Sequence, residues 1–284
     1  MACFRSQPAA FLRITGPDAP IFLQGQFTND LKPLSAGESR YGLWLTHKGK
    51  VLADSTIIKA GPEEFWIYSR DTAGAVIQKR LEDFIIADDV VVEDRSSDWE
   101  SAILVGAGAE VWLKAALRVG YIVRGRITFD DSYVWLYPKA DRSLVDAALA
   151  GVPILAASDL DRLRIQAGVA AVPQDIGAED LPNEGGLEID AVSYDKGCYL
   201  GQEVMARLKA KGRIRRHLRR VVGPGLLPAL PSALYQDGKK VGELRSAAPL
   251  ETEFVGLALL GVNYNEARPL ALEVAGEATV RLDA

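Results

Sequence analysis

The segment KGCYLGQE, residues 196–203, combines residue types that could support thiol chemistry. Cys198 lies between two glycines, two residues after Lys196 and just ahead of QEVMARLKA, a run with the composition of a helix. A nearby cation and a helix N-terminus both favour the thiolate, which is the reactive form of cysteine. The alternative is that Cys198 is a small buried apolar residue, as many free cysteines are.

The sequence is too poor in cysteine and histidine for a metal centre of its own. Two cysteines, Cys3 and Cys198, and two histidines, His47 and His217, cannot supply a structural zinc site or a cluster with four cysteine ligands. We therefore predict no metal ligands. The cysteines also cannot build a disulfide framework, which favours a reducing compartment, and we expect a cytoplasmic protein.

The elements that must position these residues are those of an α+β protein. The chain has 284 residues, 48% of them apolar and 25% charged, which is enough for two or three packed units. Strands and helices interleave over connections too short for a regular doubly wound sheet. The pattern predicts strands at 10–14, 42–46, 50–58, 64–69, 90–94, 121–123 and 133–136, and helices at 18–24, 71–84 and 110–119.

The second half of the chain divides into a helical stretch and a unit of short strands. DLDRLRIQAG, residues 159–168, predicts a helix with Ser158 and Asp161 in a capping box and Gly168 at its end. From Leu218 onward short strands alternate with turns, among them Gln236-Asp237-Gly238-Lys239, which is typical of a hairpin. We place the boundary of this all-β unit near 216–222.

Neither secretion nor a membrane partner is indicated. The first residues lack the sustained apolar core of a signal peptide, and the most apolar stretch, 147–157, is too short to span a bilayer. We expect a monomer.

The segment GLEIDAVSYDKGCYLGQEVMARLKAKG, residues 186–212, resembles the signature of the YgfZ family. These proteins are folate-binding relatives of the T-protein, the aminomethyltransferase of the glycine cleavage system. The resemblance covers nearly the whole chain and is strongest between 160 and 215. Other segments that fall in the family's order are FLQGQFTNDL at 22–31, HKGKVLAD at 47–54, LRIQAG at 163–168, LPNE at 181–184 and VGELRSAA at 241–248.

The resemblance implies an α+β fold in which three domains form a ring around a central opening. Residues 1–216 would form the T-protein-like folate-binding region, with two intertwined α+β subdomains, the first of them discontinuous and the second at roughly 50–150. Residues 217–284 would form a small C-terminal β-barrel. Tetrahydrofolate, or a one-carbon derivative of it, is the implied cofactor.

The implied function is to support the assembly or repair of iron–sulfur enzymes, with client proteins or the assembly machinery as partners. Cys198 takes the position of the family's signature cysteine, which the aminomethyltransferases lack. Lys196 and Gln202 of the same segment are the implied cofactor contacts beside it.

Asp54 leaves a second function open, that of a folate-dependent aminomethyl or demethylating transferase. HKGKVLADSTI aligns with the strand where the transferase carries its essential folate-facing aspartate, so Asp54 joins Cys198 as a catalytic candidate. It could hold the pteridine or a folate nitrogen. A surface aspartate at the end of a strand is the alternative, and the sequence alone does not decide between enzyme and helper protein.

Two further residues are candidates for folate binding. Arg164 would suit the carboxylates of folate, since a guanidinium binds them in bidentate fashion, or it is a solvated helix arginine. Glu184, in LPNE, could accept hydrogen bonds from the amino groups of the pterin ring, or it only closes a turn.

A cationic stretch at 207–220 supports a third hypothesis, an RNA-associated module. Such a patch could bind RNA phosphates or the polyglutamate tail of a folate, or it is a solvated face. The stacking aromatics of an RNA-recognition motif do not accompany it, so sequence-specific RNA binding is not indicated. The stretch consists of Arg207, Lys209, Lys211, Arg213, Arg215, Arg216, Arg219 and Arg220.

Overall fold

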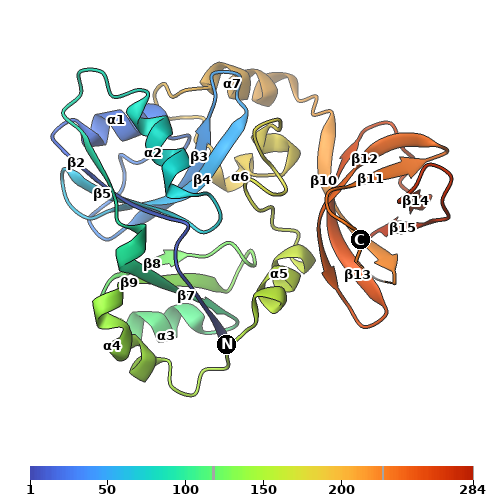
Figure 1. Cartoon of the computed structure of the whole chain (residues 1–284). Helices are drawn as coiled ribbons and strands as arrows, with labels where there is room; N and C mark the ends of the chain where they lie inside the picture. The colour runs from blue at the N-terminus through green and yellow to red at the C-terminus, as the bar shows by residue number, and fades with distance from the viewer. Residues whose placement is uncertain (117–118, 226, 284) are drawn as a thin grey trace.

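The computed structural model of the chain describes residues 1–116, 119–225 and 227–283. Three separate sheets organise these residues: one of five strands, one of four strands and one closed barrel. In Figure 1 the two open sheets lie one above the other on the left, the barrel lies on the right, and the segment that carries α5 to α7 connects them. The predicted α+β class with a C-terminal barrel is confirmed.

The five-stranded sheet is covered on both faces, which explains its almost continuous apolar strands. In β5 (Glu64–Ser69), Phe65 and Ile67 pack in the cluster beneath the helices, whereas Trp66 and Tyr68 face the four-stranded sheet. Successive side chains of a strand point to opposite faces, so both sets are buried. The strand order is β3 (Ser39–Leu45), β4 (Val51–Lys59), β5, β2 (Ala10–Thr15) and β6 (Val91–Asp94), with helices α1 (Ala19–Gln26) and α2 (Gly74–Glu82).

The four-stranded sheet is built from two distant parts of the chain. Its edge strand β1 (Ala2–Ser6) pairs antiparallel with β7 before the chain enters the first sheet. The strands of this sheet thus come from residues 2–6 and 99–138. The resemblance places the second subdomain at roughly 50–150, and that interval also contains strands of the five-stranded sheet. The order is β1, β7 (Trp99–Val105), β9 (Ser132–Pro138) and β8 (Tyr121–Arg124), with α3 (Ala109–Ala116), α4 (Arg142–Ala148) and the 3₁₀ turns η1 (Ser96–Asp98) and η2 (Lys139–Asp141).

The segment that connects the open sheets to the barrel contains the helix predicted at 159–168, but the N-terminal cap of this helix differs from the predicted one. Helix α5 (Ala157–Gln166) begins before Ser158, so the predicted Ser158 cap is wrong. Asp159 instead accepts a hydrogen bond from the backbone N–H of Ala156, at 3.4 Å, and so satisfies one of the free donors at the helix start. The segment continues with η3 (Pro182–Glu184), α6 (Glu188–Ala191) and α7 (Gln202–Lys211).

The barrel begins at Arg216, at the edge of the predicted boundary. Asp237 and Gly238 both have positive φ, 52° and 72°, which confirms the predicted hairpin turn between β11 and β12. Around the barrel the order is β10 (Arg216–Pro224), β13 (Glu253–Gly261), β12 (Lys239–Pro249), β11 (Ser232–Gln236), β14 (Leu270–Ala271) and β15 (Ala278–Leu282).

Some predictions reach beyond the described residues. The helix predicted at 110–119 is α3, which is described as far as Ala116, and positions 117 and 118 lie outside. Positions 226 and 284 of the predicted barrel also lie outside. Within the described ranges, no helix is long and apolar enough to cross a bilayer.

Candidate functional site

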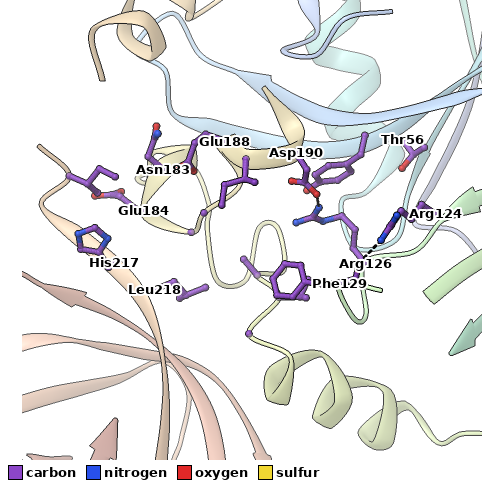
Figure 2. A pocket seen from close by; sticks show the side chains of 18 of the residues that line it. Thr56, Arg124, Arg126, Phe129, Asn183, Glu184, Glu188, Asp190, His217 and Leu218 are labelled. Carbon is purple, nitrogen blue, oxygen red and sulfur yellow. Dashed lines mark hydrogen bonds and ion pairs between the residues drawn. The ribbon is translucent and has the colours of Figure 1, made fainter. Parts of the chain in front are cut away.

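A cavity of about 880 Å³ lies where the two open sheets and the barrel meet, and we call it the junction cavity. Its size is typical of sites for small molecules and cofactors. Figure 2 shows its walls. Strands β3 and β4 contribute residues 39–41 and Thr56, and the end of β8 with the β8–β9 connection contributes 124–129. The loop after α5 contributes 168–170, and the rest comes from 183–190 and 214–219.

The walls of the junction cavity combine exposed apolar side chains with charges of both signs. Phe129 is 62% exposed and Ile189 is 83% exposed. Large apolar side chains exposed at the wall of a cavity are typical of a ligand site. The charged and titratable residues around them are Arg40, Arg124, Arg126, Arg219, His217, Glu184, Glu188 and Asp190.

Arg126 links the inner wall of the junction cavity to Asp54. Its guanidinium forms an ion pair with Asp190 of α6 and lies 4.0 Å from the ring centroid of Tyr41. The Tyr41 hydroxyl in turn donates a hydrogen bond to Oδ2 of Asp54, at 3.0 Å. In Figure 2 Arg126 reaches up to Asp190 from the β8–β9 connection.

Asp54 itself lines a second, small cavity of about 40 Å³, which we call the side chamber. Burial raises the pKa of Asp54 to about 6, with the negative charge of Asp71 acting in the same direction. Arg126, the Tyr41 hydrogen bond and Arg70 oppose this shift. A carboxyl group with such a pKa can give up or take a proton near neutral pH. The two cavities share Tyr41, Thr56, Arg124, Arg126 and Ala170.

We expect Asp54→Asn to make the protein more stable at neutral pH. Because the pKa of Asp54 is raised on folding, its carboxylate costs stability above pH 6, and the cost disappears as pH falls below the ordinary aspartate value near 4. The variant should gain at most about 3 kcal/mol at pH 7.5 and nothing at pH 3.5. Urea unfolding at both pH values measures this, with the exposed Asp83→Asn as control, and a loss of stability at pH 7.5 would contradict it.

Glu184 lines the junction cavity, and its carboxylate ties this wall to the barrel. Arg216 of β10 binds it in bidentate fashion, with Nε at 2.9 Å from Oε1 and a terminal nitrogen at 2.7 Å from Oε2. Oε2 also accepts the backbone N–H of Leu181, at 2.8 Å. Glu184 therefore closes the η3 turn and holds the barrel at the cavity wall.

Arg164 lies away from the cavity, between α5 and the barrel, and is 1% exposed. It donates to Asp175 at 2.6 Å, to the carbonyl oxygen of Val169 at 2.7 Å and to Oγ of Ser246 at 3.1 Å. Arg164 therefore binds the carboxylate of Asp175. It does not line either cavity.

Lys196 is also buried and occupied by backbone groups. Its ammonium donates to the carbonyl oxygens of Gln24 at 2.7 Å, Phe27 at 2.6 Å and Asn29 at 2.9 Å. Burial lowers its pKa to about 8. These contacts use all three ammonium hydrogens, so Lys196 holds the turn after α1 in place and has none left for a thiolate or a ligand.

Cys198 is exposed, three residues before the cap of α7 at Gly201, and Gln202 is the first residue of that helix. Among the described residues that line the two cavities are Asp54 and Glu184, but not Arg164, Lys196, Cys198 or Gln202. The structure thus separates residues 196–203, with Cys198, from the cavities, whereas the start of the 186–212 segment lines the junction cavity with Gly186, Glu188, Ile189 and Asp190. The alternative of a buried apolar cysteine does not apply to Cys198.

The cationic stretch is partly neutralised. Arg216 pairs with Asp180 and Glu184, Arg219 with Glu266 and Arg220 with Asp283, and Lys209 lies 4.2 Å from the ring centroid of Tyr194. The exposed residues that have neither an acidic nor an aromatic partner in the described part of the chain are Arg207, Lys211, Arg213 and Arg215.

Comparison with known proteins finds relatives among aminomethyltransferases, iron–sulfur cluster assembly factors and YgfZ proteins. The sequence model of the GCVT N-terminal domain matches residues 6–122. The human mitochondrial iron-sulfur cluster assembly factor IBA57 is 29% identical, over 91% of this chain and 77% of that protein. The tRNA-modifying protein YgfZ of Vibrio vulnificus is 27% identical, over 93% of this chain and 80% of that protein.

A solved structure shows the fold. The glycine cleavage system aminomethyltransferase T from Bartonella henselae matches with a TM-score of 0.80 and 19% identity, over 100% of this chain and 85% of that one. The predicted T-protein-like architecture is confirmed by this match.

Proposed function

Because the chain belongs to the YgfZ/IBA57 family, which is related to the T-protein of the glycine cleavage system, we propose that it binds a tetrahydrofolate in the junction cavity and supports the assembly or repair of iron–sulfur enzymes. The observation that carries the proposal is the junction cavity itself. It lies where three structural units meet and offers apolar surface beside guanidinium groups and carboxylates. Tetrahydrofolate needs this combination, since it joins flat rings to a glutamate tail.

The residues of the junction cavity fit the parts of a folate. Phe129 and Ile189 offer apolar surface for the rings, because their side chains are mostly exposed in the cavity wall. Arg124 and Arg219 line the cavity and offer guanidinium groups for the carboxylates of the tail, and Arg219 would exchange its exposed partner Glu266 for one of them. When bound, a tetrahydrofolate would supply a carrier for a one-carbon unit. The protein would hold it, shield it from water and keep Asp54 near its inner end.

We expect Phe129→Ala to weaken tetrahydrofolate binding by about tenfold. Removing a large aromatic surface from a binding site costs about 1–2 kcal/mol beside a flat ligand. Anaerobic titration with tetrahydrofolate, followed by tryptophan fluorescence, measures the dissociation constant. Ile86→Ala is the matched control, since Ile86 is 91% exposed and does not line the cavity. Equal dissociation constants for both variants, or no saturation at micromolar tetrahydrofolate, would remove the folate site from this cavity.

Asp54 favours a second candidate function, a folate-dependent one-carbon transferase. Its half-buried carboxyl group, hydrogen-bonded by Tyr41 and with a pKa raised to about 6, could move a proton to or from a ligand in the neighbouring cavity. Formation of methylenetetrahydrofolate from a methylated amine is the assay that separates this function from the first.

The place of action and the partners are further parts of the proposal. The two free cysteines support a reducing compartment such as the cytoplasm. Iron–sulfur client proteins or assembly factors would meet the exposed face that carries Cys198. The monomeric state stays a prediction, and the small group of unpaired cations leaves RNA as the weaker alternative partner.

A further inference from the structure

The side chamber has the dimensions of a small polar group. A single water molecule needs about 10–15 Å³ of such space, so a chamber of about 40 Å³ accepts a group of roughly three non-hydrogen atoms. Strands β4 and β5 and the β8–β9 connection form its walls, and Ile103, Ile127 and Val134 close it on the side of the four-stranded sheet. Through Tyr41 and Arg126 it adjoins the junction cavity.

Three lining residues of the side chamber carry donors that lack an acceptor within the described protein. These donors are the hydroxyl of Tyr68, one terminal nitrogen of Arg70 and Nε of Arg126. Tyr68 is 5% exposed, so its hydroxyl has little access to bulk water. A buried donor without an acceptor costs about 1–3 kcal/mol, which a ligand with suitable oxygens would recover.

The charges around the side chamber also favour a ligand with acceptor oxygens. Arg70 pairs with Asp71 at 2.7 Å and Arg126 pairs with Asp190, and in both guanidinium groups a further donor remains. Asp54 receives the hydroxyl of Tyr41 at 3.0 Å and that of Ser69 at 3.4 Å. The carboxylate of Asp54 therefore has its own donors, and the three unpaired ones require a different acceptor.

We propose that the side chamber binds a small carboxylate, held by Tyr68, Arg70 and Arg126 and placed beside Asp54. A carboxylate has three non-hydrogen atoms and accepts several hydrogen bonds, as the chamber requires. It comes either from a free one-carbon acid or from a small amino acid, whose remaining atoms extend toward the junction cavity. The biological role of this site rests on the proposed function, because the carboxylate would then lie next to a bound tetrahydrofolate.

Binding of ¹³C-formate and ¹³C-glycine to the full-length chain, measured by ligand-observed NMR, tests this inference. We expect saturable binding of at least one of them at millimolar concentration, and weakening by about tenfold or more in Tyr68→Phe, which lacks only the hydroxyl. The Tyr68 hydroxyl has no protein acceptor among the described residues, so this variant should fold normally, as thermal unfolding would show. Tyr133→Phe is the matched control, since Tyr133 lies on β9 and lines neither cavity.

The different outcomes are separable. Binding of formate supports a one-carbon acid, and binding of glycine alone supports an amino acid. Binding of methylamine but of neither carboxylate, or equal binding by wild type and Tyr68→Phe, would overturn the proposal. Competition between formate and tetrahydrofolate would also overturn it, because the folate itself would then fill the chamber. Tetrahydrofolate titration without any carboxylate tests the proposed function independently.

Discussion

Replacing Arg164 with methionine should lower the free energy of unfolding by about 3–5 kcal/mol, the cost of leaving one partner of a buried ion pair alone. Arg164 and Asp175 are 1% and 0% exposed, and their atoms approach to 2.6 Å. The guanidinium also binds Ser246 of β12, so the substitution removes a contact between α5 and the barrel. Urea unfolding measures the effect.

The control for this prediction is Arg162→Met in the same helix. Arg162 pairs with Asp159 at 2.7 Å, but both side chains are more than a third exposed, so this pair is worth about 1 kcal/mol at most. The double variant Arg164→Met with Asp175→Leu should recover much of the loss, because neither charge is then buried alone. A loss below about 1 kcal/mol for Arg164→Met would show that the pair does not hold the barrel.

Replacing Cys198 with alanine should abolish support of iron–sulfur enzymes while leaving the tetrahydrofolate dissociation constant unchanged within about twofold. The side chain is exposed and lines neither cavity, so it contributes no contact to the folate site. Its proposed role lies on the surface beside α7, in contact with client proteins or assembly factors. The activity of an iron–sulfur enzyme in a deletion strain, complemented with the variant, should fall to the level of the empty vector.

Cys3→Ala is the matched control, because Cys3 is the other cysteine of the chain. Cys3 is buried in β1, and burial raises the pKa of its thiol to about 11, so it has little thiolate. The control should complement fully, at the cost of a small core cavity. Full complementation by Cys198→Ala would contradict the proposed role of the thiol. A weakened folate affinity in that variant would contradict the separation of Cys198 from the junction cavity.

The fold could be predicted from sequence where the local pattern is strong. The apolar alternation at 64–69 predicts a strand, which is β5 in the structure, and Asp237 and Gly238 form the predicted turn. The assignment of strands to sheets could not be predicted, because β1 pairs with β7, about a hundred residues away. The cap of α5 could not be predicted, because the residue at the N-cap is Ala156, which has no capping side chain, and the capping group is the Asp159 carboxylate three residues later.

The candidate site was predicted less well, because buried polar partners are distant in sequence. Asp54 and Glu184 do line cavities, but Asp175, which occupies Arg164, carries no local signal of that pairing. Lys196 binds backbone carbonyl groups about 170 residues away. Because every residue has a backbone carbonyl group, the sequence carries no signal of this contact. Arg126 and Phe129 of the cavity could not be predicted, because they lie on the β8–β9 connection, outside residues 160–215, where the resemblance is strongest.

The central claim is that the junction cavity holds the folate and that Cys198 acts elsewhere. A structure of the protein crystallised with tetrahydrofolate under anaerobic conditions tests both parts at once. The account predicts the ligand between the β8–β9 connection and β10, in contact with Phe129 and with its inner end near Asp54 and Arg126. A ligand bound against Cys198 on the face of α7, or on the outer surface of the barrel with the junction cavity unchanged, would contradict it.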